Sequence, residues 1–420
     1  MGLNRTVRLF YTFYTLYTIF IMLISDYKFI YALFGLGSIW CVYLFFAAGY
    51  QSVKRNDDSE VFFNKSRFPF SGVSEWKPFQ YLFCDIICWA STILAARFYT
   101  SRGFVRVVSG LFNGEAAYSI YQSYARNVNS SFSVVKIPYI LMLTFLTAML
   151  IWSATGILIE VERIKPIQLF HLTSLFLSYL YFGIARGTNF EMYIAFVALV
   201  YCILNRKNRK NDANSKKSII IVLLLGFLVV VIFRIVVEAR GVSFVNRICK
   251  EITYLPDRMI SRLFPALTNM MTSIFRYLGW GTFTIGVYKY DIVLEGFKGI
   301  IANLMPLGFR TLFGSNLPDI IRATVSVGVG WVPDYMTFVD YLGLPLFFIF
   351  IFLLGRLGAW LKFSPRIPQL LADVIGLLVF IEMLSIPVGN FLFTSTPNML
   401  TVLAAALWYL YEKISIRRIS

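Results

Sequence analysis

Long apolar stretches alternate with short polar ones along most of this 420-residue chain. A helix needs about 20 mainly apolar residues to cross a bilayer, because backbone polar groups left unpaired in hydrocarbon are costly. The pattern therefore predicts one integral membrane domain over residues 1–420, all-α and polytopic. We expect ten membrane-spanning helices, with twelve as the alternative. The predicted spans are 9–25, 28–49, 79–98, 137–159, 167–185, 190–204, 218–237, 341–361, 370–393 and 397–411.

The densest basic stretch, at 205–217, is rich in lysine and lies between two predicted spans. Lys and Arg are retained on the cytoplasmic side of membrane proteins, so this stretch is predicted to be a cytoplasmic loop. Counting spans in both directions from it places the N- and C-termini in the cytoplasm and residues 99–136 and 238–340 outside. The net charge is +17, and its densest basic stretch lies between two spans, where it indicates the orientation of the protein in the membrane. We therefore expect no nucleic-acid partner.

The long segment 238–340 does not have the composition of a span. Within it, apolar residues at 257–278 recur on one side of a helix while Arg residues fall on the other, which is typical of a helix lying at the membrane interface. Asp257 is the predicted N-cap, Pro265 a kink and Gly279 the end. A weaker amphipathic pattern follows after this helix, so the segment is predicted to contain amphipathic helices.

Ionisable residues within the predicted spans are few. His171 is the chain's one histidine, and we expect it to be a hydrogen-bonded packing residue, with a proton relay as the alternative. An ionisable group in hydrocarbon usually faces a partner or a cavity. We therefore expect Glu382 to pair with Arg356 on a neighbouring helix. Asp85 and Asp373 are the other carboxylates in spans.

Arginine is frequent in segments predicted to lie outside, although the topology bias depletes basic residues there. Its planar fork binds phosphate through two hydrogen bonds and keeps its charge in a low dielectric. We interpret these residues as ligands of a diphosphate at headgroup level, with Arg186 and Arg240 as catalytic candidates. The alternative is that they pair with acidic residues such as Asp257. The candidate substrate-binding arginines are Arg258, Arg262, Arg276, Arg310 and Arg322.

Two carboxylates, Glu191 and Asp334, are expected at the outer surface and are candidates for a general base. Tyr277, Trp280 and Tyr288 lie at the same predicted level and suit sugar stacking, although interfacial belts are also rich in these residue types. The sequence contains no Gly-rich phosphate loop and no metal-ligand spacing, so we expect neither a cofactor nor a metal.

Four short motifs occur at positions that match the layout of one known protein family. They are Tyr-Phe-Gly-Ile-Ala-Arg-Gly-Thr-Asn-Phe-Glu at 181–191, Arg-Tyr-Leu-Gly-Trp-Gly at 276–281, Gly-Trp-Val-Pro-Asp at 330–334 and Asp-Tyr-Leu-Gly at 340–343. With these motifs, the whole chain resembles bacterial O-antigen and exopolysaccharide repeat-unit polymerases. It departs from them at one point. Some members have an Arg followed by Gly eleven positions later in the outer loops, and no Arg of this chain has that spacing. The resemblance therefore extends to single residues only at Arg186, Arg240 and Arg276.

The resemblance implies a metal-independent glycosyltransferase of the bacterial inner membrane, with 238–340 as a large periplasmic loop. It would join undecaprenyl-diphosphate-linked oligosaccharides into O-antigen, capsule or exopolysaccharide. The implied partners are the lipid-linked substrate, the bilayer, a chain-length regulator and a flippase. Three other functions stay open at this point: a flippase for the lipid-linked unit, a ligase that transfers the finished glycan, and a protein that organises a glycan-assembly complex.

Overall fold

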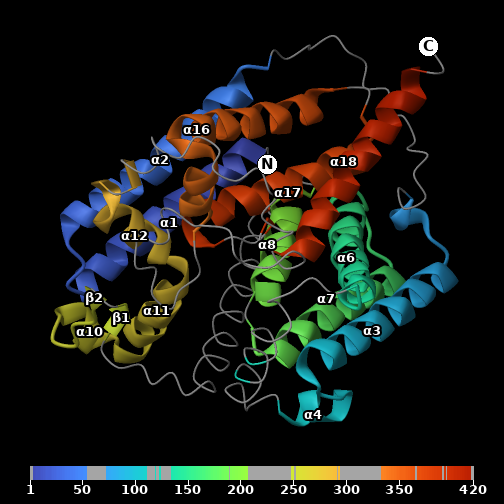
Figure 1. Cartoon of the computed structure of the whole chain (residues 1–420), viewed down its shortest axis with the longest axis horizontal. Coiled ribbons are helices and arrows are strands. Elements are labelled where there is room, and N and C mark those ends of the chain that lie inside the picture. The colour runs from blue at the N-terminus through green and yellow to red at the C-terminus, as the bar shows by residue number, and fades with distance from the viewer. Residues whose placement is uncertain are drawn as a thin grey trace.

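Seven helices in the described part of the chain are long and apolar enough to cross a membrane (Figure 1). They coincide with seven predicted spans and confirm a multi-pass, predominantly helical architecture. They are α1 (Leu3–Ile24), α2 (Phe29–Gln51), α3 (Pro78–Thr100), α6 (Lys136–Ser153) with η2 (Ala154–Ile159), α7 (Pro166–Arg186), α16 (Asp334–Phe363) and α17 (Gln369–Val388). This computed structural model describes residues 3–53, 72–110, 119, 123, 134–188, 190–206, 247–249, 252–290, 292–293, 333–364, 367–389, 392–393 and 395–417.

Three predicted spans do not belong to this set of seven. The helix α8 (Phe190–Asn205) matches the predicted span 190–204 but has 16 residues, and α18 (Thr396–Arg417) covers 397–411. The predicted span 218–237 and residues 207–217 of the predicted basic loop 205–217 lie outside the described residues. The total of ten spans therefore stays a prediction.

One short motif starts both α3 and α7. Residues 77–80 are Lys-Pro-Phe-Gln and residues 165–168 are Lys-Pro-Ile-Gln. The proline occupies the first helical turn, where its missing N–H is no loss. The side chains of Gln80 and Gln168 each accept a hydrogen bond from the backbone N–H of the preceding lysine, at 2.8 and 2.9 Å. The two helices, started in the same way, pack against each other.

Two helices pack through glycine on the side of the molecule that carries α2, α12 and α16 (Figure 1). A side chain at Gly49 of α2 would collide with the carbonyl of Phe352 in α16, and one at Gly355 would collide with the carbonyl of Phe46 in α2. In lipid, the hydrophobic effect does not drive two helices together, so they associate by close packing. Small residues allow this, because they let the two backbones approach each other. These glycines therefore set the distance between α2 and α16.

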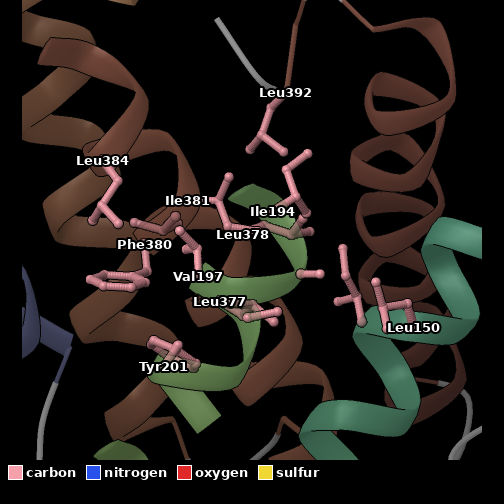
Figure 2. Packing of buried hydrophobic residues seen from close by; sticks show 14 of the residues in the cluster. Leu150, Ile194, Val197, Tyr201, Leu377, Leu378, Phe380, Ile381, Leu384 and Leu392 are labelled. Carbon is pink, nitrogen blue, oxygen red and sulfur yellow. The ribbon is translucent and has the colours of Figure 1, made fainter. Parts of the chain in front are cut away.

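The most buried span is α17, which runs through the middle of the bundle. It contacts α1, α8, α12, α16 and α18. Figure 2 shows its packing with α8 and α6, through the buried side chains of Leu377, Leu378 and Ile381, Ile194 and Val197, and Leu150. Residues far apart in the chain are held together by this helix.

The segment after residue 246 folds back onto the first two spans. Two short strands, β1 (Arg247–Cys249) and β2 (Ile252–Thr253), pair antiparallel. The turn between α1 and α2 continues this pairing, since the N–H of Asp26 donates to the carbonyl of Thr253 at 3.1 Å and that of Leu255 donates to the carbonyl of Ile24 at 3.0 Å. The turn at 25–28 and the segment 252–255 therefore lie side by side, and the predicted topology assigns both to the outside.

The predicted amphipathic helix at 257–278 is two helices, α10 (Met259–Leu263) and α11 (Pro265–Leu278). They are separated at Phe264, whose φ of −132° and ψ of 61° are not helical, so Pro265 opens a new helix and does not merely kink one. The N-cap is Arg258, and the prediction of Asp257 was wrong. The helix does end before Gly279, but α12 (Trp280–Val287) begins at once and packs against α2.

The burial of α11 also differs from an interfacial helix with a polar face in water. The polar Ser273 is buried, while the apolar Leu267 is exposed. The hydroxyl of Tyr17 in α1 donates to the carbonyl of Met271 at 2.6 Å, so α11 packs against α1. The second amphipathic pattern, at 291–305, lies outside the described residues apart from 292–293.

Candidate active site

An ion pair joins the end of α7 to the start of α8. Gly187, with a φ of 64°, ends α7 in the left-handed conformation that glycine adopts without strain. The chain then reverses, and Arg186 Nη1 lies 2.7 Å from Glu191 Oε1. Thr188 donates to the other carboxylate oxygen at 2.8 Å, and the guanidinium stacks over the ring of Phe182 at 5.0 Å.

This geometry changes the expected role of Glu191. The residue is only 2% exposed and both of its oxygens accept hydrogen bonds, so its predicted place at the surface was wrong. A carboxylate buried and hydrogen-bonded in this way is out of reach of an acceptor hydroxyl in this conformation. Arg186 keeps 20% of its side-chain surface exposed, so part of this side chain reaches the surface of the protein.

A second pair of ionisable residues joins α16 to α17. Asp334, the first residue of α16, is 0% exposed, and its carboxyl group lies beside that of Glu382, which is 2% exposed. The predicted surface position of Asp334 was therefore wrong. The predicted pairing of Glu382 with Arg356 was also wrong, because the Arg356 side chain is exposed on α16. Two adjacent carboxyl groups in a buried site repel when both are ionised, so a double negative charge is disfavoured here.

Tyrosine hydroxyls from α1 line the neighbourhood of this carboxyl pair. Tyr11 donates to the carbonyl of Met383 at 2.8 Å and lies within electrostatic reach of Glu382. Tyr14 donates to the carbonyl of Leu278 at 2.6 Å and forms a second hydrogen bond, of 2.9 Å, with the hydroxyl of Thr282. These hydrogen bonds hold the start of α12 against α1, next to Asp334 and Glu382.

The backbone of α12 reaches the same place. A side chain at Gly281 would collide with the carbonyl of Pro387 near the end of α17, and would lie 3.0 Å from Cβ of Pro333. Gly281 ends one of the four motifs and Asp334, next to Pro333, ends another. Two motifs that are far apart in the sequence therefore meet beside the Asp334–Glu382 pair.

Three predicted substrate-binding arginines lie on α10 and α11. Arg258 and Arg262 are exposed, while Arg276 is half-buried on α11. Arg262 Nη2 lies 3.5 Å from Asp257 Oδ1, with 69% and 90% of the two side chains exposed. This pairing is the alternative expected from the sequence, but pairs so exposed are weak. The arginine remains available to a stronger ligand.

The arginines on α10 border an apolar surface. Met259, Leu263, Phe264 and Leu267 are all exposed, Met259 by 76%. On α1, which packs against α11, Phe13 and Leu16 are exposed, as side chains facing lipid would be. The combination of apolar side chains with flanking arginines is suited to the boundary between acyl chains and phosphate headgroups.

The remaining candidates are placed only in part. Tyr288 directly follows α12 and is half-buried. Tyr277 lies in α11 and Trp280 opens α12, but their side chains are outside the described part of the structure. Arg240, Arg310 and Arg322 lie outside the described residues altogether.

Sequence reasoning missed the part that Tyr11, Tyr14 and Glu382 take in this site. Glu382 was noticed as a carboxylate within a span, but its partner comes from a residue predicted to be at the surface. The tyrosines gave no signal, since α1 contains many aromatic residues with similar spacing.

Comparison of the chain with protein-family models, with curated proteins and with solved structures gave no match.

Proposed function

We propose that this protein polymerises undecaprenyl-diphosphate-linked oligosaccharide repeat units at the periplasmic face of the bacterial inner membrane. The observation that carries the proposal is the meeting of two polymerase-like motifs, at Gly281 and at Pro333–Asp334, beside a buried carboxyl pair. Residues that are separated in the sequence converge in this way when they build one site.

The arginines would hold the lipid diphosphate. Arg258 and Arg262 lie beside the exposed apolar surface of α10 and α11, where a lipid-linked substrate presents its phosphates. Arg186 reaches the surface at the end of α7. Their charge would stabilise the diphosphate as it leaves the growing chain, so the proposed reaction needs no metal ion.

The carboxyl pair would take the proton of the acceptor hydroxyl. A general base must be within hydrogen-bond reach of the proton it removes. Asp334 and Glu382 are sealed in the described conformation, so binding of the acceptor must separate α12 from the end of α17. The bilayer concentrates and orients both lipid-bound substrates, which supplies proximity without further contacts.

One observation favours a flippase as the second candidate. α16 is interrupted at Gly343, with a φ of 72°, two residues before Pro345, and this break separates the segment that carries Asp334 from the rest of the helix. Broken helices with buried carboxylates also build the central sites of transporters.

The glycan profile of a strain that lacks the gene separates the candidates. A polymerase predicts that long polymer is lost while single repeat units are still displayed. A flippase predicts that lipid-linked unit accumulates on the cytoplasmic side. A ligase predicts polymer that stays on its lipid carrier. Either of the last two results overturns the proposal.

Complementation of this strain tests the site. Glu382→Gln keeps the size of the side chain beside Asp334 but cannot take up a proton, so the protein level should be normal while polymer falls at least tenfold. The matched control is Asp373→Asn on the same helix, where the carboxylate accepts from Gln369 Nε2 at 3.1 Å. Wild-type polymer from Glu382→Gln excludes this pair as the base.

A further inference from the structure

The helices α11 and α12 form a hairpin that packs against α1, α2 and α17 (Figure 1). The first of them runs antiparallel to α1. The hydroxyl of Tyr17 donates to the carbonyl of Met271, and the hydroxyl of Tyr14 donates to the carbonyl of Leu278, both at 2.6 Å. Tyr14 is about one turn farther from the end of α1 than Tyr17, so α11 enters the bundle along α1.

The second helix of the hairpin follows α2 back out of the bundle. A side chain at Gly35 would collide with the carbonyl of Thr282, and one at Gly286 would collide with the carbonyl of Tyr31. The start of α12 therefore lies beside the interior of α2, while its end lies near the start of α2. The chain enters and leaves on the same side, and it reverses at Gly279, between α11 and α12.

The reversal lies deep within the length of the two spans. A helix rises about 1.5 Å per residue, so the stretch of α1 from Tyr14 to its end at Ile24 is about 15 Å long. The stretch of α2 from its start at Phe29 to Gly35 is about 9 Å long. Half of the hydrocarbon core of a bilayer is about 15 Å thick. The turn of the hairpin therefore reaches the depth of the hydrocarbon in which α1 and α2 lie.

Burial along the hairpin changes as insertion requires. Leu267, near the start of α11, is 42% exposed, whereas Ile274 and Phe275 farther along are 8% and 1% exposed. In α12, Phe283 and Ile285 are 1% and 2% exposed. A helix lying on the surface keeps one polar face in water along its whole length. The exposed residues of α11 are instead confined to its first part.

The backbone at the turn is satisfied inside the bundle. The last carbonyls of a helix have no partner within it, and at membrane depth they need one from the protein. The Tyr14 hydroxyl donates to the carbonyl of Leu278, and the Thr282 hydroxyl donates to the carbonyl of Gly279 at 3.0 Å. The Tyr14 oxygen also lies 3.3 Å from the carbonyl oxygen of Pro387. This one hydroxyl is thus the point at which α1, α11, α12 and α17 meet.

We propose that α11 and α12 form a re-entrant hairpin, which enters the membrane from the face at which α1 ends, turns at Gly279 and returns to the same face. Backbone that reverses at membrane depth is tolerated where protein buries it, and Gly279 and Gly281 are buried. A second part rests on the proposed function. Tyr14 is a positioning residue, which touches no substrate but holds Gly281 next to Asp334 and Glu382.

Photocrosslinking in native membranes tests the hairpin without any assay of activity. Tyr14→p-benzoylphenylalanine in the full chain should capture the tryptic peptide 277–289, and Tyr17→p-benzoylphenylalanine should capture 263–276. Phe13→p-benzoylphenylalanine is the control and should capture neither, because this side chain is 65% exposed. Failure of both tyrosine positions to capture these peptides, or capture in the reverse order, overturns the hairpin.

A nitroxide label measures the depth of the turn. Phe13 is replaced by p-acetylphenylalanine, which carries the label, and the protein is placed in liposomes. Phe13 precedes Tyr14 on α1 and so lies at the depth of the turn. Insertion predicts that the label collides more often with oxygen, which dissolves in hydrocarbon, than with a water-soluble nickel complex. The opposite result places the turn at the membrane surface and refutes the re-entrant hairpin.

The positioning role has its own test. Tyr14→Phe removes the hydroxyl but keeps the ring, so polymer should fall at least tenfold at a normal protein level. Tyr17→Phe is the matched control, because it removes a similar hydrogen bond of α11 farther from the turn, and it should keep wild-type polymer. Tyr14→p-aminophenylalanine keeps a donor at the same place and should restore polymer.

The two parts of the proposal fail separately. Wild-type polymer from Tyr14→Phe, or an equal loss in Tyr17→Phe, shows that Tyr14 does not position the site, whereas the crosslinks alone decide the hairpin. A strain that lacks the gene and still makes long polymer refutes the proposed function and with it the positioning role, but leaves the hairpin intact.

Discussion

Arg186 and Glu191 form an ion pair across the break between α7 and α8, with Nη1 2.7 Å from Oε1. The arginine therefore has a structural partner as well as a proposed substrate. Removing one member of a buried pair leaves the other uncompensated, which costs about 3–5 kcal/mol. A test of Arg186 must separate these two roles.

We predict that Arg186→Ala abolishes polymer and that Arg186→Lys restores part of it, because lysine keeps the charge but loses the planar fork. Losing a transition-state contact of about 3 kcal/mol slows the reaction about a hundredfold. Polymer length on gels and protein level on blots are measured together.

The control for Arg186 is the double variant Arg186→Ala with Glu191→Gln, which leaves no unpaired charge and should be present at the normal level. It should still lack polymer. Arg209→Ala, in the predicted cytoplasmic loop and outside the described residues, should keep the wild-type chain length. If the double variant makes polymer, Arg186 serves only to hold Glu191.

The second prediction concerns the arginines of α10 and α11. Arg258→Ala, Arg262→Ala and Arg276→Ala should each reduce polymerisation without lowering the protein level. The ion pair of Arg262 with Asp257 is exposed and contributes about 1 kcal/mol or less to stability. Asp257→Ala removes the pair but keeps the arginine, so it should leave polymer unchanged. An equal loss of polymer in Asp257→Ala and Arg262→Ala would assign both residues a structural role.

The third prediction tests the packing of α12 on α2. A side chain at Gly35 would collide with the carbonyl of Thr282, whereas one at Gly37 on the same helix meets nothing within 4 Å. Gly35→Ala should destabilise the protein by about 1–3 kcal/mol, as overpacking does. Gly37→Ala should be neutral. Thermal unfolding in detergent measures both, and equal melting temperatures would show that α12 does not lie against α2.

The fourth prediction concerns topology. A cysteine at Asp257, whose side chain is 90% exposed, should react with a membrane-impermeant thiol reagent in intact cells. One at the exposed Glu162 should react only after the cells are opened. The same difference is expected between Ser315 and Asn211, both outside the described residues. Reversed labelling would place the arginine-rich segment in the cytoplasm and remove the basis for a periplasmic polymerase.

The positions of the spans could be read from the sequence because each depends on a local property. Length and apolar composition predicted α2, α3 and α7 to within about two residues at each end, whereas α1 begins at Leu3, six residues before the predicted start at residue 9. The end of α7 at Arg186 also depends on a local property, because the glycine that follows it favours the end of a helix. The break at Phe264 was only partly anticipated, because whether a proline kinks or restarts a helix depends on what the two parts pack against.

The apolar pattern was enough to predict a multi-pass helical membrane protein, and the positions of Arg186, Glu191, Asp334, His171 and Glu382 marked them as residues to explain. Their partners became known from the packing of the helices: Glu191 lies against Arg186, Glu382 beside Asp334, and His171 between Asp85 and Ser153. This difference follows from the range of each interaction. A span is selected by transfer of its own residues into lipid, whereas a buried charge is neutralised by whichever group the packing of separate helices brings next to it.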